Sequence, residues 1–130
     1  MVWQSICDKM ISLDSAIRFV GVASMQGSIL AAKYRTGLQP LLTTEESELS
    51  IMHSVIRMSM RKTQEKQLGK PIYAFALYQK VKRATIVAYD SASETEELVM
   101  VSLDKDSNHD SIISEKILPY LRSAGRKILD

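Results

Sequence analysis

The stretch FVGVASMQGSILAAKYR, residues 19 to 35, decides the fold of this chain. It reads as two strands, 19–24 and 28–34, joined by a tight turn at Gly27, where glycine adopts the positive φ that other residues disfavour. Apolar or small side chains occupy both alternating sets of positions, so neither face of this hairpin suits water. We therefore predict a sheet with helices packed on both of its faces.

The segments around this hairpin predict three helices and three more strands. An apolar stripe from Trp3 to Ile17, at steps of three and four residues, predicts an amphipathic helix before the hairpin. A second helix begins at the capping-box spacing of Thr43 and Glu46 and ends before Gly69. The remaining strands and the last helix are expected at 72–78, 84–89, 98–103 and 110–124. This order gives an α+β fold, in the broad α/β class, whose five-stranded antiparallel sheet carries helices on both faces.

The C-terminal part of the chain departs from a regular helix at two places. Pro119 lies inside the last helical pattern, where it lacks the N–H that would bond the carbonyl of Glu115. We therefore expect a kink or a late start of that helix. The last residues, 125–130, read as a tail that frays from the domain.

The composition fits one compact cytoplasmic domain. A chain of 130 residues with 45% hydrophobic and 25% charged residues can bury one core, so we expect a single domain over 1–130 with its core at about 3–124. No apolar run is long enough to cross a bilayer, and the start of the chain does not read as a secretory signal. A single cysteine fits a reducing compartment, and the net charge of +2 does not by itself indicate nucleic acid or a membrane.

The hairpin also carries the pattern V-x-V…G-x-x-L-A, formed by Val20, Val22, Gly27, Leu30 and Ala31. Together with the order of elements, this pattern resembles the roadblock family of dynein light-chain and small-GTPase regulators, within the profilin-like fold. The helix before the first strand favours roadblock over longin domains, and the resemblance implies an archaeal member of the family. The resemblance implies a non-enzymatic dimeric scaffold that binds a cytosolic protein partner, such as a small Ras-like GTPase, and needs no cofactor.

The second helix carries more apolar surface than one sheet face requires. Its apolar residues cover an arc of about 200° in two adjoining stripes. We expect the stripe of Ile51, Val55 and Met58 to lie at or near the two-fold axis of a homodimer. In the resembled family the third strand also pairs edge to edge with its symmetry mate, which implies Ile72 and Tyr73 here. The alternative is that the loop before the helix covers its surplus apolar surface. The other stripe consists of Leu49, Met52, Ile56 and Met60.

The sequence offers no catalytic constellation. The glycine-lysine pair at 69–70 is followed by proline in place of Ser or Thr, so no phosphate-binding loop is expected. His53 and His109 are far apart in the chain and have no paired cysteines near them, which disfavours a zinc site. We interpret His53 as a partly buried residue beside the apolar stripe and Cys7 as a small core residue. No enzyme activity, catalytic residue or cofactor is predicted.

One polar stretch, DKDSNHDSIISE at 104–115, has the spacing of a calcium-binding loop. Its first, third, fifth, seventh and twelfth positions carry oxygen ligands, which are Asp104, Asp106, Asn108, Asp110 and Glu115. However, His109 stands where the loop needs glycine, and a strand leads into it in place of a helix. The alternative interpretation is a polar loop whose Asp110 or Ser111 caps the last helix.

Two further hypotheses concern ligands. The tip of the second hairpin carries Lys80, Lys82 and Arg83, a basic patch that would contact nucleic-acid phosphates unless it is only a solvated turn. The chain is alternatively a small-molecule sensor that holds its ligand between sheet and helix. Free volume beside the sheet distinguishes this sensor from the scaffold, because a close-packed interior leaves no room for a ligand.

Overall fold

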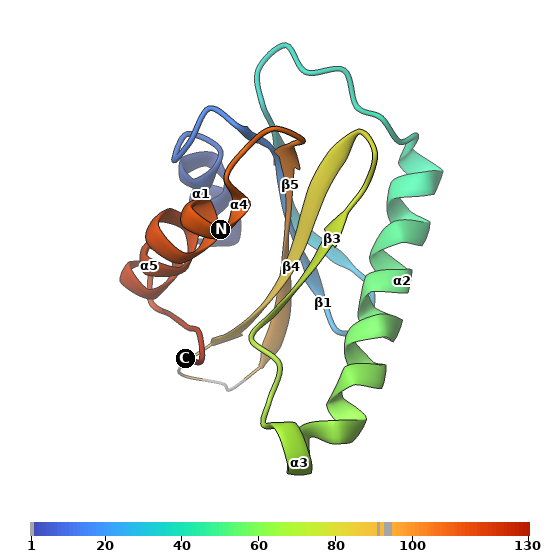
Figure 1. The fold of residues 1–130 in the computed structure, drawn as a ribbon, viewed down its shortest axis with the longest axis vertical. Helices are drawn as coiled ribbons and strands as arrows, with labels where there is room; N and C mark the ends of the chain where they lie inside the picture. Colours follow the sequence, from blue (N-terminus) through green and yellow to red (C-terminus); the bar gives the residue numbers. More distant parts are fainter. Residues whose placement is uncertain (1, 91, 93–94) are drawn as a thin grey trace.

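One central sheet with helices on both faces organises the chain. The computed structural model describes residues 2–90, 92 and 95–130. Figure 1 shows α1, α4 and α5 on one face of the sheet and α2 alone on the other. The helical elements are α1 (Val2–Met10), α2 (Thr44–Arg61), η1 (Lys62–Gln64), α3 (Glu65–Leu68), α4 (His109–Ser111), η2 (Ile112–Ile117) and α5 (Leu118–Ser123). The strands are β1 (Ile17–Ser24), β2 (Ile29–Tyr34), β3 (Tyr73–Leu77), β4 (Val81–Asp90), β5 (Glu96–Asp104) and β6 (Arg126–Lys127).

The strands are antiparallel and follow the order β2-β1-β5-β4-β3. This confirms the predicted five-stranded sheet and adds the short strand β6, which pairs with the end of β4. The expected fraying of 125–130 is therefore wrong for the residues of β6 and for Ile128. Arg126 lies over the ring of Trp3, 4.4 Å from its centroid, and Ile128 is buried, so contacts with the first helix and the core hold the tail.

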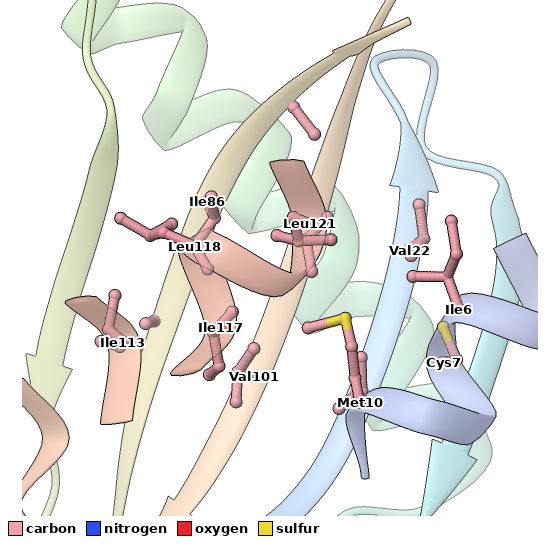
Figure 2. Close-up of a cluster of buried hydrophobic side chains, with 14 of the residues drawn as sticks. Ile6, Cys7, Met10, Val22, Ile86, Val101, Ile113, Ile117, Leu118 and Leu121 are labelled. Atoms are coloured by element: carbon pink, nitrogen blue, oxygen red, sulfur yellow. The ribbon is translucent and has the colours of Figure 1, made fainter. Parts of the chain in front are cut away.

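The hairpin of β1 and β2 forms as predicted, and its two faces enter different cores. Gly27 has a φ of +88° at the turn, the conformation that favours glycine. Val20 and Val22 join the core beneath α1 and α5, whereas Ala23 packs with Ile51 of α2 and Met100 on the opposite face. Figure 2 shows the first core, where side chains of α1, such as Met10, lie between β1 and the C-terminal helical segments.

The first helix is shorter than its apolar stripe suggested. It ends at Met10, and Ile17 begins β1. The carboxylate of Asp14 accepts a hydrogen bond from the backbone N–H of Ala16, and the carbonyl of Asp14 accepts one from Ile17. This local turn competes with further helix, as short polar side chains often do.

The C-terminal helix accommodates Pro119 by a wider turn instead of a kink or a late start. Residues Ile112–Ile117 form a π-helical segment, and the N–H of Leu118 donates to the carbonyl of Ile113, five residues earlier. Pro119 then lies in the first turn of α5, where its missing N–H costs least. Among the described helices, none combines the length and apolar composition that crossing a membrane requires.

Helix α2 begins at the predicted capping box. The hydroxyl of Thr43 accepts from the N–H of Glu46, and the carboxylate of Glu46 accepts from the N–H of Thr43. Both bonds satisfy backbone donors that the first turn of a helix leaves without partners. The helical region ends at Gly69, whose φ of +83° stops it as predicted.

The capping box gives a direct test of how α2 begins. Thr43→Ala removes one cap bond and should lower the free energy of unfolding by about 1 kcal/mol. Thr44→Ala, at the next residue, keeps both cap bonds and should change it by no more than a few tenths of a kcal/mol. Urea unfolding at one fixed protein concentration measures both. Equal effects of the two substitutions would contradict the assigned cap.

Candidate functional site

Helix α2 faces the sheet with the stripe that we expected to meet a second copy. Ile51 and Met58 are 6% and 0% exposed, and they pack against Met100 and Leu98 of β5. Val55 is partly buried beside them. Placing Ile51 and Met58 at a contact between copies is therefore wrong, because the chain's own sheet covers them, whereas Val55 keeps part of its surface exposed. Ser54, a small residue buried in the same stripe, lets the helix approach the sheet closely and donates its hydroxyl hydrogen bond to the carbonyl of Ser50.

The second apolar stripe of α2 is the exposed one. Its four residues, Leu49, Met52, Ile56 and Met60, are between 53% and 66% exposed. The stripe borders the β1–β2 turn, because a Cβ added at Gly27 would lie 3.6 Å from Cγ of Met52. His53, expected to be partly buried, is also exposed. We refer to Leu49, Met52, Ile56 and Met60 as the outer stripe.

The opposite flank of α2 is basic and faces β3. Ser54, Arg57 and Arg61 line a groove of 210 Å³ together with Ala74 and Ala76 of β3. Arg57 donates a 3.3 Å hydrogen bond to the hydroxyl of Ser54. This side of the helix therefore presents guanidinium groups beside an edge strand, whereas the outer stripe presents apolar ones.

The outer edge of β3 is open among the described residues. The N–H of Tyr78 donates to the carbonyl of Val81, and the N–H of Val87 donates to that of Ile72. Because hydrogen-bonded and non-hydrogen-bonded pairs alternate in an antiparallel ladder, Tyr73, Phe75 and Leu77 direct their backbone groups outward. Ile72 and the side chain of Tyr73, predicted at a contact between copies, pack partly on the core beneath α1 and α5.

The other edge of the sheet is partly covered. The side-chain amide of Gln4 in α1 donates a 3.1 Å hydrogen bond to the carbonyl of Ala32 in β2. Ala32 faces Gly21 in a non-hydrogen-bonded pair, so this carbonyl points away from β1. Helix α1 thus occupies one outward backbone carbonyl of β2, so this edge is only partly available to a further strand.

A cavity of 470 Å³ lies between the sheet and the N-terminal half of α2. The loop 35–43, which arches over this end of the sheet in Figure 1, closes one side of it with Leu38, Leu41 and Leu42. The β3–β4 turn closes another side with Tyr78 and Lys80. The close packing expected against a small-molecule sensor is therefore absent at this end of the sheet.

Four residues cross the floor of the cavity in one row. They are neighbours on adjacent strands, in the order Tyr34, Phe19, Ser102 and Arg83. The rings of Tyr34 and Phe19 lie with centroids 4.7 Å apart. The Phe19 ring covers Gly21, where an added Cβ would come within 2.6 Å of it, so glycine is required for this ring position. We refer to these four residues as the floor row.

The charged side chains that line the cavity are all basic: Arg18, Lys80 and Arg83. Arg18 forms an ion pair with Asp104, at 3.3 Å. Arg83 donates a 2.7 Å hydrogen bond to the hydroxyl of Ser50 and lies 5.9 Å from the ring centroid of Tyr78. Among the described residues it makes no ion pair. Its charge is therefore not neutralised within the cavity.

The predicted calcium loop does not assemble a ligand set. The carboxylate of Asp104 is held by Arg35, at 2.9 Å, and by Arg18, and the carbonyl oxygen of the Asn108 side chain caps α4 by accepting from Ser111. Within residues 2–90, 92 and 95–130, no three acidic, histidine or cysteine side chains are grouped as metal ligands. The spacing of acids at 104–115 therefore reflects an arginine-bound strand end and a helix cap.

The predicted basic patch is also divided by the structure. Lys82 donates to the carbonyl of Ser107, whereas Arg83, the next residue of β4, points to the opposite face and bonds Ser50 on α2. Lys80 lies at the exposed turn. Because successive residues of a strand face opposite sides, the three side chains do not form one surface.

Two titratable side chains, Cys7 and Glu97, are buried. Burial raises the pKa of the Cys7 thiol to about 11, so the thiol stays protonated at neutral pH, in agreement with its interpretation as a core residue. Glu97 was not singled out from the sequence because it was read as part of the polar loop before the strand 98–103, whereas the structure includes it in β5. It is 6% exposed, and burial raises the pKa of its carboxyl, while Trp3 and Arg126 oppose that shift.

Solved structures similar to this chain identify its fold. Gliding protein MglB from Thermus thermophilus is similar with a TM-score of 0.68 and 11% identity, over 93% of this chain and 81% of that chain. The roadblock/LC7 domain from Streptomyces avermitilis is similar with a TM-score of 0.66 and 7% identity, over 92% and 94%. The chain has the roadblock fold. A structure described as MglB with tetrameric arrangement has a TM-score of 0.67 and 11% identity, over 93% and 80%.

Sequence comparison adds nothing to this likeness. No protein-family model matches the chain, and no curated protein matches it either. The fold predicted from the hairpin and the order of elements is thus confirmed by the similarity of the structures. The sequence identities of 11% and 7% to these structures are low, and the likeness lies in the fold.

The two ion pairs of Asp104, with Arg18 and with Arg35, predict that the free energy of unfolding depends on pH. Hydrogen bonds, first from Arg35 and then from Arg18, lower the pKa of Asp104 below its ordinary value, although burial opposes the shift. Because the folded-state pKa lies below the unfolded one, this stabilisation is complete above a pH of about 4 and is lost as pH falls through the folded-state pKa.

Asp104→Asn should therefore destabilise the protein at neutral pH and have a progressively smaller effect in acid. Urea unfolding of both proteins between neutral pH and about pH 2 measures the difference. Asp106→Asn, an exposed neighbour, serves as the control and should cost little at any pH. A cost of Asp104→Asn that stays constant across this range would contradict the ion-pair assignment.

Proposed function

We propose that this chain is a non-enzymatic regulatory scaffold that self-associates and binds a cytosolic protein of the small Ras-like GTPase class. The observation that carries the proposal is the outer stripe, because it stays exposed on a helix whose opposite side is already packed. The roadblock fold of the solved neighbours supports the same role by analogy.

The open edge of β3 supports self-association by strand pairing. Tyr73, Phe75 and Leu77 present backbone donors and acceptors outward, and an unpaired edge of this kind is a template for another strand. A copy related by two-fold symmetry offers the same groups in the reverse direction. Two β3 strands can therefore pair antiparallel and continue the sheet across a homodimer.

The charges on the β3-facing flank of α2 support the same arrangement. Glu46 precedes Arg57 by about three helical turns, so the two residues lie on one flank of the helix. In an antiparallel pair of helices, Glu46 of one copy approaches Arg57 of the other, and the reverse contact forms by symmetry. Ser50 lies between them, and its small side chain permits a close approach.

The outer stripe remains available to a partner in this dimer. It borders the β1–β2 turn, whereas the pairing flank faces β3. Each copy then presents its own outer stripe on the side of α2 away from the two-fold axis, as an apolar surface that the dimer contact does not cover. The buried core of a protein interface is more apolar than the rest of the surface and is enriched in methionine, so this surface suits a protein better than a small ligand.

Strand pairing through β3 is tested by removing one outward N–H. Leu77→Pro eliminates a donor of the open edge and leaves the hydrogen bonds between β3 and β4 intact, because Leu77 does not bond to β4. Light scattering after size-exclusion chromatography should give twice the chain mass of 14.6 kDa for the natural protein and a larger monomer fraction for the variant.

Leu77→Ala is the matched control, because it shortens the same side chain and retains the N–H. It should remain dimeric. Circular dichroism verifies that both variants fold. A natural protein that is monomeric at tens of micromolar, or a folded Leu77→Pro variant that dimerises as strongly as Leu77→Ala, would refute pairing through β3.

Partner binding is tested on the outer stripe. Ile56→Glu places a charge in its centre and should weaken binding of a purified Ras-like GTPase from the same source at least tenfold, without changing the dimer mass. Lys9→Glu, an exposed charge change on the other face of the sheet, should leave binding unchanged. Calorimetric titration of each variant with the GTPase, in its GDP-bound and in its GTP-bound state, provides the measurement. Undiminished binding to Ile56→Glu would exclude the outer stripe as the binding surface.

A further inference from the structure

The cavity beside the N-terminal half of α2 has the size and lining of a ligand site, and the scaffold role does not use it. Its volume of 470 Å³ lies within the range of small-molecule sites, which is about 300–1,000 Å³. Apolar side chains surround it on three sides, from the sheet, from Ile51 of α2 and from the leucines of the loop 35–43. Leu41 and Leu42 remain 55% and 40% exposed there, so the chain itself does not fill this space.

The floor row gives the cavity an apolar end and a cationic end. Phe19 and Tyr34 form a tilted aromatic pair at the first end, and Arg83 lies at the other with Ser102 between. Because neighbouring strands lie about 4.8 Å apart, the backbones of Phe19 and Arg83 are about 10 Å from each other. A molecule with one or two fused rings and a terminal charged group has the length to span this separation.

The charged side chains that line the cavity determine which sign of charge a ligand can carry there. The charged residues around the cavity are Arg18, Lys80 and Arg83, and no acidic side chain of the described residues lines it. Asp104 neutralises Arg18, but Arg83 bonds only the neutral hydroxyl of Ser50 within the described chain. A guanidinium group in this position favours a carboxylate, which it can bind through two parallel N–H bonds.

We propose that this cavity binds a small amphipathic carboxylate, whose apolar part lies on Phe19 and Tyr34 and whose carboxylate pairs with Arg83. The flat aromatic end favours a ring system over a flexible chain. The lining of the cavity includes neither the outer stripe nor the outward-facing residues Tyr73, Phe75 and Leu77 of β3, so ligand binding and self-association can fail separately.

A matched pair of probes tests the charge requirement. Calorimetry with 2-naphthoate should detect one site per chain, and its methyl ester, which has the same rings and no charge, should bind at least tenfold more weakly. Decanoate, a flexible carboxylate, should bind more weakly than 2-naphthoate. Absence of 2-naphthoate binding at millimolar concentration, or equal affinity for acid and ester, would overturn the proposal.

Two variants locate the site. Arg83→Gln should reduce the preference for 2-naphthoate over its ester to less than threefold, whereas Arg122→Gln, which removes an exposed guanidinium of α5 outside the cavity, should retain it. Ser102→Phe fills the middle of the floor row and should abolish binding of both probes. Circular dichroism and the dimer mass verify that each variant is folded. Binding that survives in a folded Ser102→Phe protein, or a preference that Arg83→Gln leaves intact, would contradict the assigned position.

Discussion

One helix has to cover a sheet face that is about twice its width. Neighbouring strands lie about 4.8 Å apart, so the five strands of the main sheet span roughly 20 Å, whereas a helix with its side chains is about 10–12 Å across. On one face of the sheet, α1, α4 and α5 share this coverage (Figure 1). On the other face α2 is alone. Its burial of Ile51 and Met58 fixes the helix over the sheet and leaves uncovered area beside it.

The proposed sites lie where that coverage is incomplete. At one end of the sheet, the loop 35–43 and the floor row enclose the cavity instead of a packed core. Along the other flank of α2, Arg57 and Arg61 border a groove beside the open edge of β3. The small residues Gly21 and Ser54 let the Phe19 ring and the helix lie close to the sheet beside these spaces.

Local signals allowed much of the fold to be predicted from the sequence. The turn at Gly27, the capping box of Thr43 and Glu46, and the stop at Gly69 each depend on neighbouring residues, and all three are confirmed. The sequence did not reveal which stripe of α2 packs on the sheet, because both stripes are apolar and the choice depends on strands distant in the sequence. The apparent calcium ligand Asp104 is instead bound by Arg18 and Arg35, which lie far from it in the sequence, and no spacing within 104–115 reveals them.

The candidate site was less predictable than the fold for the same reason. The floor row takes one residue from each of four strands, so its members come together only when the strand order and register are known. The π-helical turn before Pro119 likewise depends on how the C-terminal helical segments pack, and the proline alone predicted only a disturbance.

Amide hydrogen exchange in β3, measured residue by residue at low and high protein concentration, tests the central claim of self-association most directly. Ala74 and Ala76 donate to β4 within the chain and should be protected at both concentrations. Tyr73, Phe75 and Leu77 point outward, and their amides should exchange quickly in dilute solution and become protected in concentrated solution, when a second β3 pairs with them. Exchange at these three amides that is equally fast at both concentrations would contradict the proposed scaffold.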